Sequence, residues 1–199
     1  MFLGTTIALA AGLNPYVATL VVAALAGTSS RVQLTGPFAG VEPNAWRAAI
    51  AVAALLAAVD LTLGKLRHRF FVMRWASLAV ATTSGASGAV VGVGSDADPA
   101  IVATLGAVAA AVTSLSVTQV ARHALAYGAW LRLGHIPVMM GATVVAAIAI
   151  PLTLTFSWPG TAVAAIAAVS FLVAAVRTWS ASPSGNLAHP GVPDNPPNT

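Results

Sequence analysis

The sequence contains no cysteine, which excludes disulfide bonds, thiolate metal sites and a cysteine nucleophile. It is also poor in charge: only 7% of its 199 residues are Asp, Glu, Lys or Arg, against about 25% in an ordinary soluble domain. So few charges cannot cover the surface of a soluble fold of this size, and 58% of the residues are hydrophobic. The sequence therefore predicts an integral membrane protein.

Motifs for catalysis and metal binding are missing as well. There is no HExxH, GxSxG or P-loop sequence, and the histidines at positions 68, 123, 135 and 189 lack the spacing of metal ligands. We therefore expect no enzymatic activity, no metal and no cofactor. The net charge of +4 does not indicate nucleic-acid binding, because the positive charges lie in short loops between apolar stretches.

Six apolar stretches run along the chain, each close to the roughly 20 residues that a spanning helix needs. None shows the alternating pattern of a membrane β-strand. We therefore predict an all-α fold, a polytopic transmembrane helix bundle within residues 1–179. The stretches cover residues 2–27, 45–64, 70–94, 99–121, 137–156 and 160–179.

Two further segments carry separate expectations. Residues 122–136 mix basic and aromatic side chains, and they either extend the fourth stretch or form a short interfacial helix. Residues 180–199 are rich in Pro, Ser and Asn, with too few apolar side chains to build a core. We expect them to form a disordered cytoplasmic tail.

The positive charges alternate between loops, which fixes the expected orientation. Lys65, Arg67 and Arg69 lie between the second and third stretches, and Arg122 and Arg132 lie between the fourth and fifth. The loop between the third and fourth stretches carries acids and no base. The positive-inside rule then places both basic loops in the cytoplasm. We expect a multi-pass protein of the cell inner (plasma) membrane with both termini cytoplasmic.

Asn14 and Pro15 interrupt the first stretch. Pro15 lacks a backbone N–H, clashes with the carbonyl four residues before it, and disfavours helical geometry at Asn14. We expect a helix that is kinked or split into two short halves, with its freed backbone groups turned away from lipid. Tyr16 adds a hydroxyl at the same place. The break either serves packing alone or lines a substrate site, as discontinuous helices do in many transporters.

Other polar side chains in the apolar stretches extend this candidate cavity. Asp60, the only acid inside a predicted segment, is either functional or paired with a basic residue at the interface. In the fourth stretch, polar residues three to four positions apart share one helical face, which either lines a cavity or bonds to a neighbouring helix. The candidate cavity residues are Asn14, Tyr16, Asp60, Thr113, Ser116, Gln119, Arg122 and His123.

Small residues in the third stretch predict close helix packing. Gly88 and Gly92 form a small-xxx-small pair, and Gly85 extends it by one turn. These three glycines are expected to serve close helix packing.

Several of these elements resemble motifs of an uncharacterised bacterial inner-membrane family, DUF 4126. The segment "AGLNPY", ending in Tyr16, is similar to the family's opening Gly-x-x-x-Tyr element. "VDLTLGKL" resembles a Glu-x-x-x-Asp-Lys element, with Asp60 and Lys65 at its ends and a glycine in place of the second acid. "TQVAR" resembles a His-x-x-Lys element, with Gln119 and Arg122 in those positions. The resemblance covers most of the apolar part of the chain and implies a helical membrane fold.

We expect a transporter or permease-like protein for a small solute or a lipid-like molecule, because of the broken first helix and the polar face of the fourth stretch. The alternative is a non-catalytic accessory or assembly subunit of a larger membrane complex, since Ala- and Gly-rich helices pack closely against partners. The expected partners are membrane lipids and either another membrane protein or a second copy of this chain.

Overall fold

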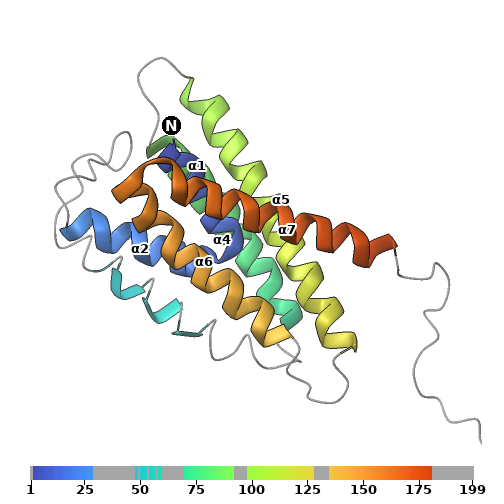
Figure 1. Cartoon of the computed structure of the whole chain (residues 1–199). Coiled ribbons are helices and arrows are strands. Elements are labelled where there is room, and N and C mark those ends of the chain that lie inside the picture. The colour runs from blue at the N-terminus through green and yellow to red at the C-terminus, as the bar shows by residue number, and fades with distance from the viewer. Residues whose placement is uncertain are drawn as a thin grey trace, which may run out of the picture.

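The structure, a computed structural model, describes residues 2–28, 48, 50–52, 54–56, 58–59, 70–91, 98–127 and 135–180 (Figure 1). These residues are helical almost throughout and include no strand. The helices are α1 (Phe2–Leu13), α2 (Pro15–Thr28), α4 (Phe70–Val91), α5 (Pro99–Tyr127), α6 (His135–Phe156) and α7 (Trp158–Ser180). The predicted all-α helix bundle, with its first helix broken at Asn14–Pro15, is confirmed. Asp60, Gly92 and the tail after residue 180 lie outside the described residues.

Within the part of the chain that the structure describes, three helices are long and apolar enough to cross a membrane, over Pro99–Ala124, Ile136–Phe156 and Trp158–Ser180. α5 begins with an Asp98 cap, whose carboxylate accepts the N–H of Ala100 at 2.8 Å, followed by Pro99 at the first helical position. It continues to Tyr127, so residues 122–127 extend the fourth stretch, and residues 128–134 lie outside the described residues. Ser157, in the left-handed conformation with φ of 67°, separates α6 from α7.

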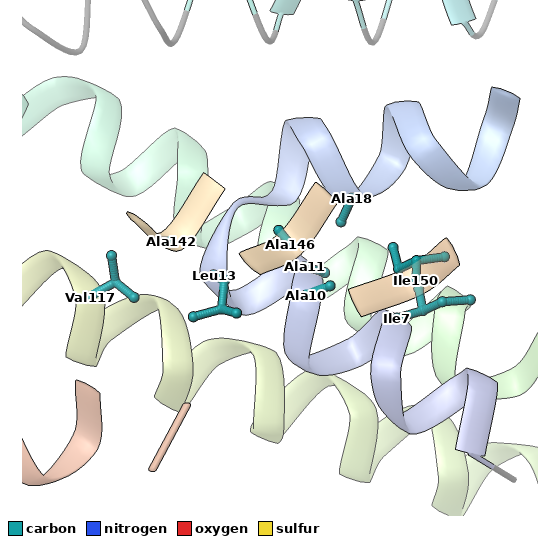
Figure 2. Close-up of a cluster of buried hydrophobic side chains, with 9 residues drawn as sticks. All are labelled: Ile7, Ala10, Ala11, Leu13, Ala18, Val117, Ala142, Ala146 and Ile150. Atoms are coloured by element: carbon teal, nitrogen blue, oxygen red, sulfur yellow. The ribbon is translucent and has the colours of Figure 1, made fainter. Parts of the chain in front are cut away.

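The interior of the bundle is rich in alanine, whereas many of the large apolar side chains are exposed. In the central cluster drawn in Figure 2, five of the nine buried residues are alanine. Large apolar side chains instead recur on the exposed faces every three or four residues. These are Ile101, Leu105, Val108, Val112 and Leu115 on α5, and Val163, Ile166, Val169, Val173 and Val176 on α7. Such faces are unsuited to water and are typical of helices in contact with lipid, which supports a membrane protein.

α1 lies in the middle of the bundle, in contact with α4, α5, α6 and α7 (Figure 1). α2 does not continue its direction but turns back along the bundle (Figures 1 and 2). The contacts with α4 follow this reversal. Near its start, α1 meets α4 where Gly4 approaches the Ala89 backbone. The first turn of α2 packs on Val80, in the middle of α4. The Thr19 hydroxyl, farther along α2, lies 3.2 Å from the Ser84 hydroxyl, which is closer to Ala89 along α4.

The two short helices therefore form a re-entrant unit, the α1–α2 hairpin. Their 12 and 14 residues correspond to about 18 and 21 Å, and neither spans the roughly 30 Å of a hydrocarbon core. Both helices extend from one end of the bundle to its middle. The apolar stretch over residues 2–27, expected as one segment split at its centre, is thus split without crossing the bundle.

Side-chain contacts also define the two ends of the bundle. The Thr161 hydroxyl, in the first turn of α7, donates to the Phe2 carbonyl at 3.2 Å. Ser180 ends the same helix, so Phe2 and Ser180 lie about 30 Å apart along α7. We call these the Phe2 end and the Ser180 end. α5 and α7 run from the Phe2 end to the Ser180 end, and α4 and α6 run the opposite way.

Candidate functional site

Asn14 is the tip of the α1–α2 hairpin and caps α2. Its side-chain oxygen accepts the N–H of Val17 at 3.1 Å, and its amide nitrogen donates to the Thr143 hydroxyl of α6 at 2.8 Å. Pro15 occupies the first position of α2, where a missing N–H does least harm. Asn14 is 3% exposed, so a buried amide both starts the second half-helix and fastens the tip to α6.

The backbone reverses at a single residue. The N–H of Asn14 bonds to the Ala10 carbonyl at 2.9 Å, ending α1, and its carbonyl accepts the N–H of Ala18 at 3.0 Å, starting α2. Pro15 has no N–H, so the Ala11 carbonyl lacks its ordinary helical donor. Asn14 therefore keeps its own backbone bonds, while an acceptor is freed one turn before the tip.

A second proline frees another acceptor at the same depth. Pro151 lies inside α6, so the Ala147 carbonyl also lacks its ordinary helical donor. Ala147 packs against the pair Tyr16 and Val17 in the first turn of α2. The two prolines thus leave two carbonyls, of Ala11 and Ala147, beside the hairpin tip.

Tyr16 contributes a buried hydroxyl to this region. The residue is 6% exposed, and its phenolic oxygen has no hydrogen-bond partner among the residues described. Buried hydroxyls are ordinarily paired with protein or water. Side chains of a helix lean toward its N-terminus, and Tyr16 is the second residue of α2, so its ring leans toward the tip.

The predicted polar face of α5 reaches the tip only in part. Thr113 is buried beside the tip, where a Cβ on Gly12 would meet its Cβ at 2.5 Å. Ser116, also buried, follows one turn later. The hydroxyls of Thr113 and Ser116 each donate at 2.8 Å to a carbonyl one turn back on α5.

The remaining candidates lie elsewhere. Gln119 and His123 are half-buried and Arg122 is exposed, all farther along α5 toward the Ser180 end. The structure therefore gathers Asn14, Tyr16 and Thr113 at the hairpin tip, with Ser116 one turn away. It does not bring Gln119, Arg122 and His123 there, and Asp60 falls outside the described residues.

Two polar contacts were missed by the sequence reasoning. One is Thr143, the partner of Asn14. The other is a hydroxyl cluster in which the Thr6 oxygen lies 3.0 Å from that of Thr153 and 2.7 Å from that of Thr161. This cluster joins α1 to α6 and α7 near the Phe2 end. Isolated threonines in alanine-rich stretches were the only available signal, and they do not identify their partners.

Two of the predicted packing glycines lie at helix contacts. A Cβ on Gly85 would lie 2.8 Å from the Gly106 carbonyl oxygen of α5, and one on Gly88 would meet the Ile7 side chain of α1. α4 therefore packs closely against both α5 and α1.

The described groups at the tip are donors and acceptors of hydrogen bonds. Within the described residues, no group of three or more His, Asp or Glu side chains is placed to hold a metal ion. The polar side chains at the tip, those of Asn14, Tyr16, Thr113 and Thr143, are all uncharged.

No family model matches the chain, and the searches of curated proteins and of solved structures found no similar protein. The resemblance to DUF 4126 stays a prediction.

Proposed function

We propose that this chain is a small transport protein, permease-like or channel-like, of the plasma (inner) membrane. The observation that carries the proposal is the α1–α2 hairpin, which ends at a buried amide in the middle of the bundle. Half-helices that end at mid-depth are costly in a membrane, because their terminal N–H and C=O groups cannot bond to lipid. In transporters such ends line solute sites.

The direction of the hairpin supports a role for both helix ends. Backbone N–H groups point toward the start of a helix and C=O groups toward its end. Because α2 runs back along α1, the N–H groups that start α2 and the C=O groups that end α1 both point past the tip, toward the Ser180 half of the bundle. A solute entering from that end would meet donors and acceptors together. An accessory subunit, the alternative, would need tight packing but no such polar tip.

The proposed orientation places the Ser180 end in the cytoplasm. Arg122 and Arg177 lie near that end, and the basic residues 65, 67 and 69 come directly before α4 in the sequence, at its Ser180 end. Exposed Trp158 and Trp179, at opposite ends of α7, are separated by about 32 Å, close to the hydrocarbon thickness. Since the hairpin returns to the end where it starts, we propose that Phe2 lies outside and the C-terminus inside. This revises the expectation of two cytoplasmic termini.

The orientation is testable because the sequence has no cysteine. Single substitutions Phe2→Cys and Ser180→Cys place one thiol at each end of the bundle. We expect a membrane-impermeant maleimide to label Phe2→Cys on intact cells and Ser180→Cys only after permeabilisation. Equal protection of both thiols in intact cells would restore two cytoplasmic termini.

Transport is tested by purified protein in liposomes, with stopped-flow light scattering for glycerol and urea and fluorescent indicators for K⁺ and Cl⁻. We expect faster permeation than in protein-free liposomes for at least one of these solutes. The acceleration should fall in Asn14→Ala and persist in Thr104→Val, which removes an exposed α5 hydroxyl bonded only within its own helix. Permeation no faster than in protein-free liposomes for the whole panel would contradict a transport function.

A further inference from the structure

We propose that the tip of the α1–α2 hairpin binds small uncharged solutes that carry hydroxyl or amide groups, such as polyols and urea-like molecules. This inference rests on the proposed transport function and names the substrate class of the same site. It follows from three features of the tip: its neutral side chains, its opposed helix ends and its unused hydrogen-bonding groups.

The first feature is the absence of charge among the described residues of the tip. The nearest charged side chain along α5 is Arg122, nine residues beyond Thr113 and about 13 Å away along the helix axis. An ion at mid-depth in a membrane protein ordinarily meets an opposite charge or a water-filled cavity. The described part of the tip provides no such charge.

The second feature is the meeting of two helix ends of opposite polarity. The C-terminus of α1 carries a partial negative charge and the N-terminus of α2 a partial positive charge, each about half an elementary charge. At the hairpin tip the two lie one residue apart, at Asn14, so their fields largely cancel. A single helix end would favour an anion or a cation, whereas this pair favours a neutral molecule that both donates and accepts hydrogen bonds.

The third feature is a set of polar groups with unused bonding capacity. The Tyr16 hydroxyl is buried without a partner among the described residues, and it both donates and accepts. The carbonyls of Ala11 and Ala147 lack their helical donors because prolines follow four residues later. Each carbonyl can accept a hydrogen bond from a solute –OH or –NH group, and the Tyr16 hydroxyl can donate to or accept from one. A hydrated ion would have to lose its water to contact these groups.

The test compares solute permeation in liposomes holding the full chain, with glycerol and urea as neutral probes and K⁺ and Cl⁻ as ions. Tyr16→Phe removes only the unpartnered hydroxyl, so the variant is expected to fold. Thr19→Val is the matched control, because it removes a hydroxyl one turn farther along α2 whose bonding is already taken up by the Pro15 carbonyl and the Ser84 hydroxyl.

We expect glycerol or urea to permeate faster than in protein-free liposomes, with no added K⁺ or Cl⁻ flux. Tyr16→Phe should slow the neutral solute by about fivefold to tenfold, the effect of one lost hydrogen bond, and Thr19→Val should leave it unchanged. Ion flux without glycerol or urea flux would overturn the substrate class and leave transport standing. Neutral flux that is insensitive to Tyr16→Phe would overturn the tip as the binding site. No flux of any probe would overturn the transport function itself.

Discussion

At the scale of the residue, Asn14 combines two roles that are usually separate. Its oxygen caps α2 and its nitrogen donates to Thr143 on α6. We predict that Asn14→Ala lowers the free energy of unfolding by about 2–3 kcal/mol, the sum of a lost helix cap and a lost buried hydrogen bond.

A double-mutant cycle with Thr143→Val separates the two roles, read by thermal unfolding in detergent. Thr143→Val alone removes the partner of the amide but leaves the cap. We expect a coupling energy between the two sites of about 1 kcal/mol. Additive effects would show that the Asn14–Thr143 bond contributes nothing to stability.

The break at this residue was predictable from the sequence, but its geometry was not. Proline chemistry alone indicates that the helix stops at Asn14, because Pro15 lacks an N–H and restricts the residue before it. Whether the chain then continues or folds back depends on Thr143, Val80 and Ser84, whose positions are set by other helices. An apolar half-helix is equally compatible with either course, so composition does not distinguish them.

At the scale of the element, glycines allow particular helices to pack closely. A Cβ on Gly106 would lie 2.5 Å from the Gly85 carbonyl oxygen, whereas one on Gly141 would meet nothing within 4 Å. We predict that Gly106→Ala destabilises the bundle by about 1–3 kcal/mol through overpacking. Gly141→Ala, the matched control on α6, should stabilise it by up to about 1 kcal/mol, because alanine favours a helix.

Thermal unfolding of the two variants in the same detergent checks this prediction. A loss of stability in both would contradict the open space around Gly141 and the gain expected there from helix propensity. Equal gains in both would mean that the backbones of α4 and α5 do not pack closely at Gly85 and Gly106.

Of the two helices in the α4–α5 contact, only the packing face of α4 was predictable from the sequence. The Gly85 and Gly88 pattern in the third stretch indicates a close contact, but the facing Gly106 is the single glycine of its stretch, and its pair with Ala110 does not stand out among the many alanines there. Periodicity within one helix reveals a face suited to packing. The partner helix and its register depend on how all the helices share the interior, which no single stretch encodes.

At the scale of the whole molecule, the distribution of side-chain size indicates the surrounding medium. Alanine, glycine and hydroxyl residues make up much of the interior, and many of the larger apolar side chains of α5 and α7 face outward. The overall composition predicted this medium directly. It could not predict that the first apolar stretch turns back halfway through the bundle, since the length of that stretch alone suits a spanning helix.

The exposed face of α7 gives a direct test of the medium. Ile166 is 67% exposed and lies between Trp158 and Trp179, about 12 Å from the first along the helix axis. In water, Ile166→Arg would be close to neutral, because the side chain contacts little. In a membrane it places a charge within the hydrocarbon, at a cost of about 2.5–3.5 kcal/mol on the insertion scale. We therefore predict that Ile166→Arg reduces the amount of protein in the membrane fraction several-fold. Ser180→Arg, at the proposed cytoplasmic end of the same helix, should accumulate like the wild type. Equal accumulation of the two variants would mean that the outer face of α7 is not in contact with lipid.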